Sequence, residues 1–241
     1  MPRPGSNVRL SSSAPELSAP VTPLDPSTKT QILDVAERLF AEQGFAATSL
    51  RALTAAAGVN LAAVNYHFGS KEALLLAVFD RRLRPLNERR IASLDALVRQ
   101  AAAAGLAPSL EGLLDTLFRP VLEMTAEPGG EACARLFARV HLETEAEALE
   151  SMFLTQFCAV RDRMLPALKQ TLPELDEDEL LWRLHFAIGA LAHTMQSTIR
   201  LKWLARGRAI ETDRETTLRR LIEFCAAGMR AGAPSRPPEG T

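Results

Sequence analysis

Polar side chains that can bind nucleic acid gather in one short stretch, residues 48–71 of a 241-residue chain. The amide of Asn65 can form a bidentate pair with adenine, which is one way of reading a base in the major groove. Hydroxyl, phenol, imidazole and ammonium groups typically hold phosphates and so set the register of a protein on DNA. These groups are supplied by Thr48, Tyr66, His67 and Lys71. The combination predicts contacts to a DNA duplex.

Three residues of this stretch have a competing structural interpretation. His67 lies next to Phe68 and can equally fill the seam between two helices. Asn60 can be fully occupied in capping a helix, because its side-chain oxygen accepts from the free amides of the first turn. Arg51 can contact a phosphate or be a solvated residue on an outer helix face. Both interpretations stay open for each residue.

Two short helices and a tight turn must position these groups. Residues 49–57 are rich in alanine and leucine, and Leu50, Leu53 and Ala57 recur on one helical face. Gly58 follows where this helix must stop, since glycine adopts the left-handed conformation without a steric penalty.

The second helix is expected over residues 61–67, with Leu61 and Val64 pointing inward. Helix, glycine turn and helix form the unit that lays its second helix in a DNA major groove.

A preceding helix is expected to brace this unit from behind. Residues 28–31 fit a capping box, and an amphipathic pattern continues to Gln43, where Gly44 ends it. Thr48 is expected to cap the next helix. A three-helix domain results.

A fourth helix is expected to follow over residues 71–100, capped by Ser70. Pro85 should kink it or split it at Arg84, because proline removes a backbone donor. Further helices are predicted over residues 109–125, 131–142, 144–172 and 176–205, and from a capping box at residues 212–215.

Composition favours an all-α fold. Hydrophobic residues make up 47% of the chain and aromatic residues only 5%, and alanine and leucine dominate. The net charge is −1, and the charges within residues 29–80 tilt acidic. Any DNA contact must therefore come from a local patch, and this balance weighs against a nucleic-acid function.

Four regions are expected along the chain. They are a disordered arm (residues 1–27), a DNA-binding domain (28–87), a helical domain that binds an effector and dimerises (88–232) and a flexible tail (233–241).

Residues 58–74, GVNLAAVNYHFGSKEAL, resemble the glycine turn, recognition helix and HF-x-x-K-x-x-L signature of the tetracycline-repressor (TetR/AcrR) family of bacterial transcription regulators. The similarity extends upstream through residues 32–50 and covers roughly residues 28–80. Thr54 and Asn65 depart from the family's pattern, since many members carry alanine and tyrosine there. The resemblance implies an N-terminal three-helix helix-turn-helix domain and a C-terminal helical domain for ligand binding and dimerisation.

The function implied is that of a ligand-responsive regulator of transcription, a repressor that binds a palindromic DNA operator as a homodimer. The residues expected at the DNA are Thr48, Arg51, Asn60, Leu61, Ala62, Asn65, Tyr66, His67 and Lys71.

The C-terminal helices carry apolar stripes that predict half of a four-helix dimer interface, which is also how this family dimerises. The residues expected in it are Trp182, Phe186, Gly189, Ala192, His193, Gln196, Leu218, Leu221, Ile222 and Cys225.

In this family a small molecule enters a cavity of the C-terminal domain and changes the separation of the two DNA-binding heads. Here the expected lining favours a hydrophobic or amphipathic effector. It consists of Phe118, Met124, Phe137, His141, Phe153, Phe157, Met164 and His185. Residues 182–193, WRLHFAIGALAH, together with residues 59–71, resemble the fatty-acid-responsive (PsrA-like) branch, which implies a fatty acid or acyl-CoA.

Two other function classes compete with this interpretation. The acidic balance of the N-terminal domain supports a helical interaction module that has lost DNA binding. A helical metal protein or enzyme is disfavoured, because His185 and His193 are too far apart for paired zinc ligands on one helix and no catalytic motif is present. No catalytic residue, metal ligand or cofactor is therefore expected.

The cysteines and the hydropathy pattern predict a cytoplasmic protein. Cys133, Cys158 and Cys225 are isolated in helix-like stretches, as expected for reduced thiols. The sequence has no signal-peptide core and no run of roughly 20 apolar residues that could span a membrane.

Overall fold

A computed structural model describes residues 26–134, 136, 147–196 and 199–232, and the regular secondary structure of this part is helical throughout. The helices are α1 (Pro26–Gln43), α2 (Leu50–Ala57), α3 (Leu61–Phe68), α4 (Lys71–Ala103), α5 (Leu110–Ala126), α7 (Glu147–Thr171), α8 (Glu177–Gln196), α9 (Ile199–Leu204) and α10 (Arg214–Arg230). Residues 130–134 are also helical. The predicted all-α fold is confirmed.

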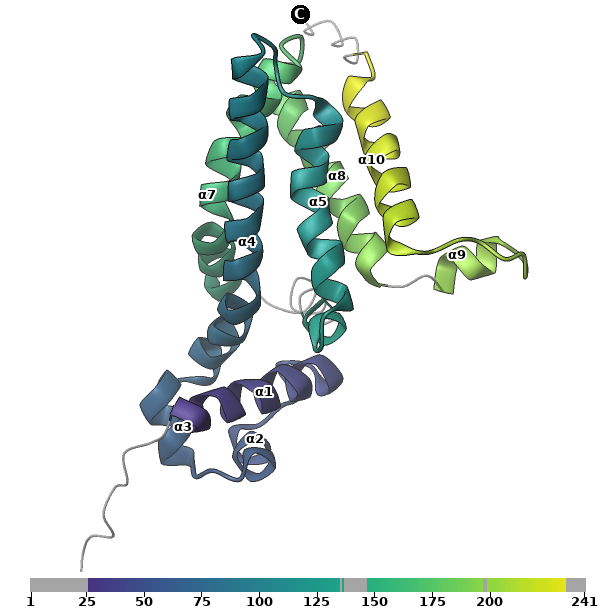
Figure 1. Cartoon of the computed structure of the whole chain (residues 1–241). Coiled ribbons are helices and arrows are strands. Elements are labelled where there is room, and N and C mark those ends of the chain that lie inside the picture. The colour runs from purple at the N-terminus through teal and green to yellow at the C-terminus, as the bar shows by residue number, and fades with distance from the viewer. Residues whose placement is uncertain (1–25, 135, 137–146, 197–198, 233–241) are drawn as a thin grey trace, which may run out of the picture.

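The helices form a small head and a larger body (Figure 1). The head consists of α1, α2, α3 and the first part of α4, up to Leu83, and it has its own hydrophobic core. The body contains the rest of α4 with α5, α7, α8 and α10, which surround a second core. The change from one core to the other falls between Leu83 and Leu86, close to the predicted boundary after residue 87.

The helices of the head lie where the amphipathic pattern predicted them, with two differences at the helix starts. α1 begins at Pro26, so residues 26 and 27 of the predicted arm are helical; the rest of that arm and the predicted tail lie outside the described residues. Ser49, rather than Thr48, caps α2, because its hydroxyl accepts from the backbone N–H of Ala52 at 3.1 Å.

The turn between α2 and α3 depends on Gly58. Its backbone is left-handed, with φ 61° and ψ 28°, which a residue with a Cβ atom adopts only with strain. Immediately after it, Asn60 caps α3 by accepting from the N–H of Ala63 at 2.8 Å.

α4 is one helix of 33 residues that passes through Pro85 without a break, so of the two predicted alternatives, a kink or a split at Arg84, the split does not occur. Leu83 and Leu86 on either side of the proline are both buried, one in each core. Packing at these two positions holds the helix together where proline removes one hydrogen bond.

One C-terminal helix begins differently from the prediction. The helix predicted over residues 176–205 is described in two parts, α8 and α9, and residues 197 and 198 between them lie outside the described residues. α10 is capped by Asp213, whose carboxylate accepts from the N–H of Thr216 at 3.0 Å, rather than by Thr212. Aspartate and threonine are both good caps, so adjacent candidates are not separated by type alone.

A buried carboxylate ties the head to the body. Glu37 of α1 is only 4% exposed and forms ion pairs with Arg81 and with Arg82, whose Nε lies 3.0 Å from the carboxylate. Arg82 also donates to the carbonyl oxygen of Pro128, 3.0 Å away, in the turn that follows α5. One guanidinium therefore joins α1, α4 and the end of α5.

We expect Glu37→Gln to lower the free energy of unfolding by about 3 kcal/mol, because removing one partner of a buried ion pair leaves the other charge uncompensated. Urea denaturation followed by circular dichroism measures it. The matched control is Glu223→Gln, which breaks an exposed pair with Arg219 and should cost less than about 0.5 kcal/mol. Equal losses in the two variants would contradict the structural role of Glu37.

Candidate nucleic-acid interface and ligand cavity

The outward face of α3 is where the head presents side chains to a partner. Leu61, Ala62, Asn65 and Tyr66 are all exposed, and Tyr66 is 76% exposed. Leu61 was expected to point inward, but its side chain is 49% exposed, and Ala63 and Val64 fill the head core instead. Asn65 has no side-chain hydrogen bond to the described residues that could occupy its amide.

Thr48 was predicted to contact DNA, and the structure contradicts this. Its side chain is buried, and its hydroxyl donates to the carbonyl oxygen of Gly44 at 2.8 Å, with Leu39 O at 3.3 Å. The hydroxyl therefore closes the turn after α1 and presents no surface to a phosphate.

Three other residues predicted to contact DNA differ in exposure and in the contacts that their side chains already make. Arg51 is exposed on the outer face of α2. The Lys71 ammonium lies 4.4 Å from the ring centre of Phe45 and 3.5 Å from Ala46 O, and partial burial lowers the pKa of this amine. Asn60 is exposed, but its oxygen caps α3, as one of its two interpretations predicted.

His67 lies on the inner side of α3. Its ring packs edge-on against Tyr66 with ring centres 5.2 Å apart, and Phe68 lies beyond it. The Nε2 atom is buried and has no hydrogen-bond partner among the described residues. This placement favours the interpretation that His67 fills a seam between helices.

A cavity of ≈ 460 Å³ lies in the body between α4, α5, α7 and α8. This volume is within the range of small-molecule sites. Leu83, Leu86, Val121, Val160, Leu184 and Leu191 are typical of its apolar walls. The basic side chains in the lining are Arg90, Arg161 and His185.

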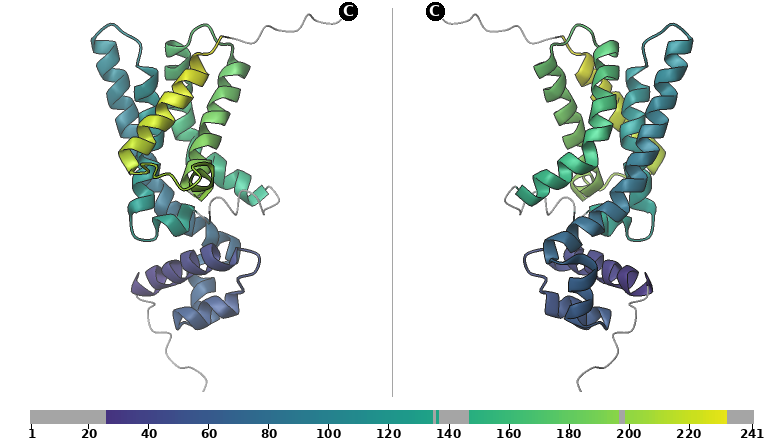
Figure 2. Two further views of the ribbon diagram at one scale, coloured as in Figure 1. Left: turned by 90° about the vertical axis from the view of Figure 1, so that its right-hand side faces the viewer. Right: turned by 90° about the vertical axis from the view of Figure 1, so that its left-hand side faces the viewer.

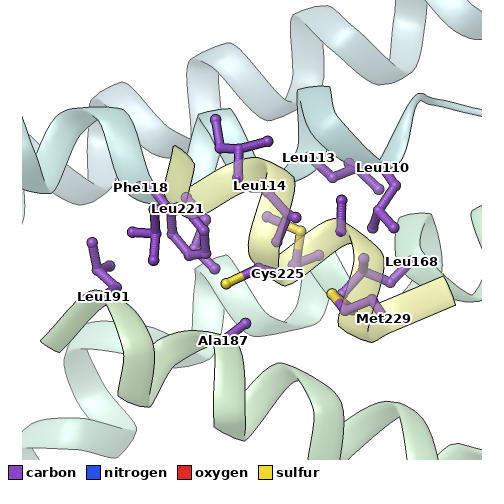
Figure 3. Packing of buried hydrophobic residues seen from close by; sticks show 14 of the residues in the cluster. Leu110, Leu113, Leu114, Phe118, Leu168, Ala187, Leu191, Leu221, Cys225 and Met229 are labelled. Atoms are coloured by element: carbon purple, nitrogen blue, oxygen red, sulfur yellow. The ribbon is translucent and has the colours of Figure 1, made fainter. Parts of the chain in front are cut away.

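Four of the residues predicted to bind a ligand lie in this lining: Met124, Phe157, Met164 and His185. Phe118 does not, because it is fully buried in the body core (Figure 3). Phe137 and His141, and the side chain of Phe153, lie outside the described residues.

Arg90 is a lining residue that sequence analysis did not single out. It is 6% exposed, and its Nε and one terminal nitrogen donate to the carbonyl oxygen of Leu117 at 3.0 and 2.8 Å. The other terminal nitrogen donates to Asn87 Oδ1 at 3.1 Å. Burial lowers the pKa of the guanidinium to about 10, so it stays charged at neutral pH. The sequence contains a signal for this residue, because Arg90 interrupts an apolar helical stripe between Leu86 and Leu94.

α8 and α10 lie side by side at one side of the body (Figure 2). Both helices expose apolar side chains. Trp182 and Phe186 on α8 are 59% and 64% exposed, with ring centres 5.7 Å apart, and Phe224 on α10 is 71% exposed. Gly189 and His193 of α8 are also exposed. Apolar surface of this kind is typical of an interface.

The α10 residues predicted at a dimer interface instead face the protomer's own core. They are Leu218, Leu221, Ile222 and Cys225. Figure 3 shows Leu221 and Cys225 among side chains of α5 and α8. The prediction failed because an apolar stripe shows that a face is buried and does not show what buries it.

Two further residues predicted at the dimer interface belong to α8. Ala192 lines the cavity, and the Gln196 side chain lies outside the described residues.

Two family models match the chain. The model of "Bacterial regulatory proteins, tetR family" matches residues 32–78. The model of "Tetracyclin repressor-like, C-terminal domain" matches residues 115–228.

Among the described helices, none is both long enough and apolar enough to cross a bilayer.

Individual proteins with similar sequences are also transcription regulators. The chain is 34% identical to the HTH-type transcriptional repressor KstR2 of Rhodococcus jostii (strain RHA1) over 95 residues, which are 39% of this chain and 43% of KstR2. It is 40% identical to the HTH-type transcriptional regulator AcrR of Shigella flexneri over 68 residues, 28% of this chain and 29% of AcrR. The chain thus spans less than half the length of these curated relatives.

A solved structure extends the likeness in fold to most of the chain. NalD, the secondary repressor of the MexAB-OprM multidrug efflux pump in Pseudomonas aeruginosa, superimposes with a TM-score of 0.56 at 22% identity. The match covers 84% of this chain and 95% of NalD.

The two asparagines of α3 are expected to respond differently to truncation. Asn60→Ala should lower the free energy of unfolding by about 1 kcal/mol, because a helix cap is lost. Asn65→Ala should change it by less than about 0.5 kcal/mol, because the side chain is solvated. Urea denaturation of both variants measures this; an Asn60→Ala variant as stable as wild type would show that its side chain is free for another role.

Proposed function

Because the chain belongs to the TetR family of bacterial regulatory proteins, we propose that it is a ligand-responsive transcriptional repressor acting in the cytoplasm. It binds a palindromic operator as a homodimer, and a hydrophobic small molecule in the body cavity releases it. The outward face of α3 is the observation that carries the proposal. On that face Asn65 and Tyr66 are exposed, and α3 is capped at both of its ends.

The head reads DNA through few side chains, so its geometry matters more than its overall charge. α3 has eight residues, and a helix of this length reaches only a few base edges. Two copies related by a twofold axis read two half-sites and reach the affinity that one copy lacks. Asn65 is proposed to read a base, and Tyr66, Lys71 and Arg51 to hold phosphates.

Dimerisation is proposed through the outer faces of α8 and α10. Trp182, Phe186 and Phe224 expose aromatic rings that water solvates poorly, and a second copy would cover them. The exposed Gly189 lets another helix backbone approach closely on the same face.

The cavity is proposed as the effector site because its wall includes residues of the head core. Leu83 belongs to the head core and also lines the cavity. Phe157 packs against the head core and lines the cavity from α7. A ligand that moves these side chains favours one head position over another, which is a population shift. A fatty acid or acyl-CoA suits the apolar walls.

One observation favours an interaction module without DNA binding. Arginines near the end of the head are paired with carboxylates: Arg81 with Asp34 and Glu37, and Arg84 with Asp80. These guanidinium groups are not free to bind phosphates, which leaves the head with little local positive charge.

A mobility-shift titration with the intergenic DNA beside the gene tests the function. Wild type should bind one duplex selectively, with an affinity that falls as salt rises. Asn65→Ala should weaken selective binding about tenfold, because a bidentate base contact contributes about 1–3 kcal/mol. Gln100→Ala, an exposed amide at the far end of α4, should bind as wild type.

Two outcomes oppose parts of this proposal. Selective binding by Asn65→Ala equal to wild type removes Asn65 from base reading. The absence of salt-dependent affinity for any duplex would instead support the interaction module.

The dimer interface is tested separately with Phe186→Arg. A buried unpaired charge opposes association, so this variant should sediment as a monomer where wild type sediments as a dimer, and bind operator at least about tenfold more weakly. Leu106→Arg is the control, since it places the same charge at an exposed apolar position in the turn between α4 and α5. A dimeric Phe186→Arg variant would place the interface elsewhere.

A further inference from the structure

We propose that Arg90 binds the acidic head group of the effector, so that the cavity selects an amphiphile with one carboxylate and an apolar body. This inference rests on the proposed function, because it concerns the same cavity. A carboxylate site in the cavity would favour one of the two ligands that suit the apolar walls. A free fatty acid offers a carboxylate at the end of its chain, whereas an acyl thioester is uncharged at that position, so the fatty acid is favoured.

Arg90 has hydrogen-bonding capacity left in the cavity wall. A guanidinium has five N–H donors. Three are used by bonds to Leu117 O and Asn87 Oδ1. Among the described residues no acceptor bonds to the remaining N–H on each terminal nitrogen. These two donors match the two oxygens of a carboxylate.

The existing bonds of Arg90 set its orientation. Leu117 O holds the guanidinium from α5, and Asn87 is itself fixed because its amide donates to Gln156 O at 2.7 Å. Arg90 is therefore held directly by α5 and by Asn87 of its own helix α4, and indirectly by α7 through Asn87. These bonds keep its remaining donors in place before a ligand arrives. Preorganised donors bind with a smaller loss of conformational entropy.

Within the part of the chain that the structure describes, no opposite charge lies close to Arg90. No carboxylate among the described residues forms an ion pair with it, and the described cavity lining contains no Asp or Glu. Every other buried or half-buried arginine discussed above has a carboxylate partner, as Arg81 and Arg82 do. A buried charge without a partner is unfavourable, so an anionic ligand would gain more here than at the surface.

The rest of the cavity accommodates an apolar body. Around Arg90 the lining is supplied by leucine, valine, methionine and phenylalanine from four helices. Towards α8, the side chains of Leu181 and Ile188 are partly exposed and form an apolar rim with His185. A single buried arginine among the apolar walls of the described lining matches one anionic group on an apolar chain, since Arg161 in the same lining is exposed.

Isothermal titration calorimetry of the full-length protein tests this with three probes that share one alkyl chain: dodecanoate, 1-dodecanol and dodecylammonium. Wild type should bind dodecanoate at least about tenfold more tightly than dodecanol, since hydrogen bonds to a charged group contribute about 1.5–3 kcal/mol. Dodecylammonium should bind most weakly. Equal binding of dodecanoate and dodecanol to wild type overturns the proposal.

Variants assign the preference to Arg90. Arg90→Met should weaken dodecanoate about tenfold and leave dodecanol within about threefold. The matched control is Arg163→Met, because Arg163 lies on α7 next to the cavity residue Met164 but is exposed, pairs with Asp95 and does not line the cavity. It should leave both affinities within about threefold. A folded Arg90→Met variant that loses both probes equally makes Arg90 a brace between α4 and α5 and overturns the proposal.

A second variant covers the case in which Arg90→Met does not fold. Arg90→Lys keeps the positive charge and should keep a preference for dodecanoate over dodecanol, although a smaller one. Loss of this preference in a folded Arg90→Lys variant would count against the proposal.

Operator release separates this inference from the proposed function. If dodecanoate binds through Arg90 but does not release the operator in a mobility shift, the proposed mode of regulation fails and the assignment of Arg90 stands. If dodecanoate releases wild type and Arg90→Met equally, the regulation stands and the assignment fails.

Discussion

The two hydrophobic cores share one continuous helix, and the remaining structure depends on that constraint. α4 contributes Leu74 to Leu83 to the head core and Leu86 to Leu94 to the body core. Because α4 is continuous across both cores, a shift of its body half is passed on to the residues that pack in the head core. The buried Glu37 carboxylate strengthens the connection, since Arg82 bonds both to it and to the turn after α5.

The cavity lies beside this shared helix, which gives the body a physical route to the head. Leu83 touches both the cavity and the head core, and Leu136, from beyond α5, is fully buried in the head core. Body and head are therefore in direct contact through packed side chains as well as through α4. Packed cores respond to added volume by discrete rearrangement, because they contain little free space.

Arg81 and Arg90 lie in different environments, one with carboxylate partners and one in the cavity wall. Where α4 passes from the head to the body, burial alone would lower the pKa of Arg81. Its pairs with Glu37 and Asp34 outweigh that effect and raise the pKa, which stabilises the cation. In the cavity wall, burial lowers the pKa of Arg90, and no carboxylate of the described residues pairs with it. The first arrangement is complete within the chain, whereas the second becomes complete when an anion binds.

The sequence by itself determined the helical fold, the glycine turn at Gly58 and the cap at Asn60, because these depend on local patterns and backbone conformation. It also predicts that Asn65 contacts a base, which stays a prediction. Only the tertiary structure decided that Thr48 is buried, that the stripe through Leu221 faces its own protomer, and that α4 continues through Pro85. Each of these depends on which distant surface a residue meets, and helical periodicity specifies a buried face without specifying its neighbour.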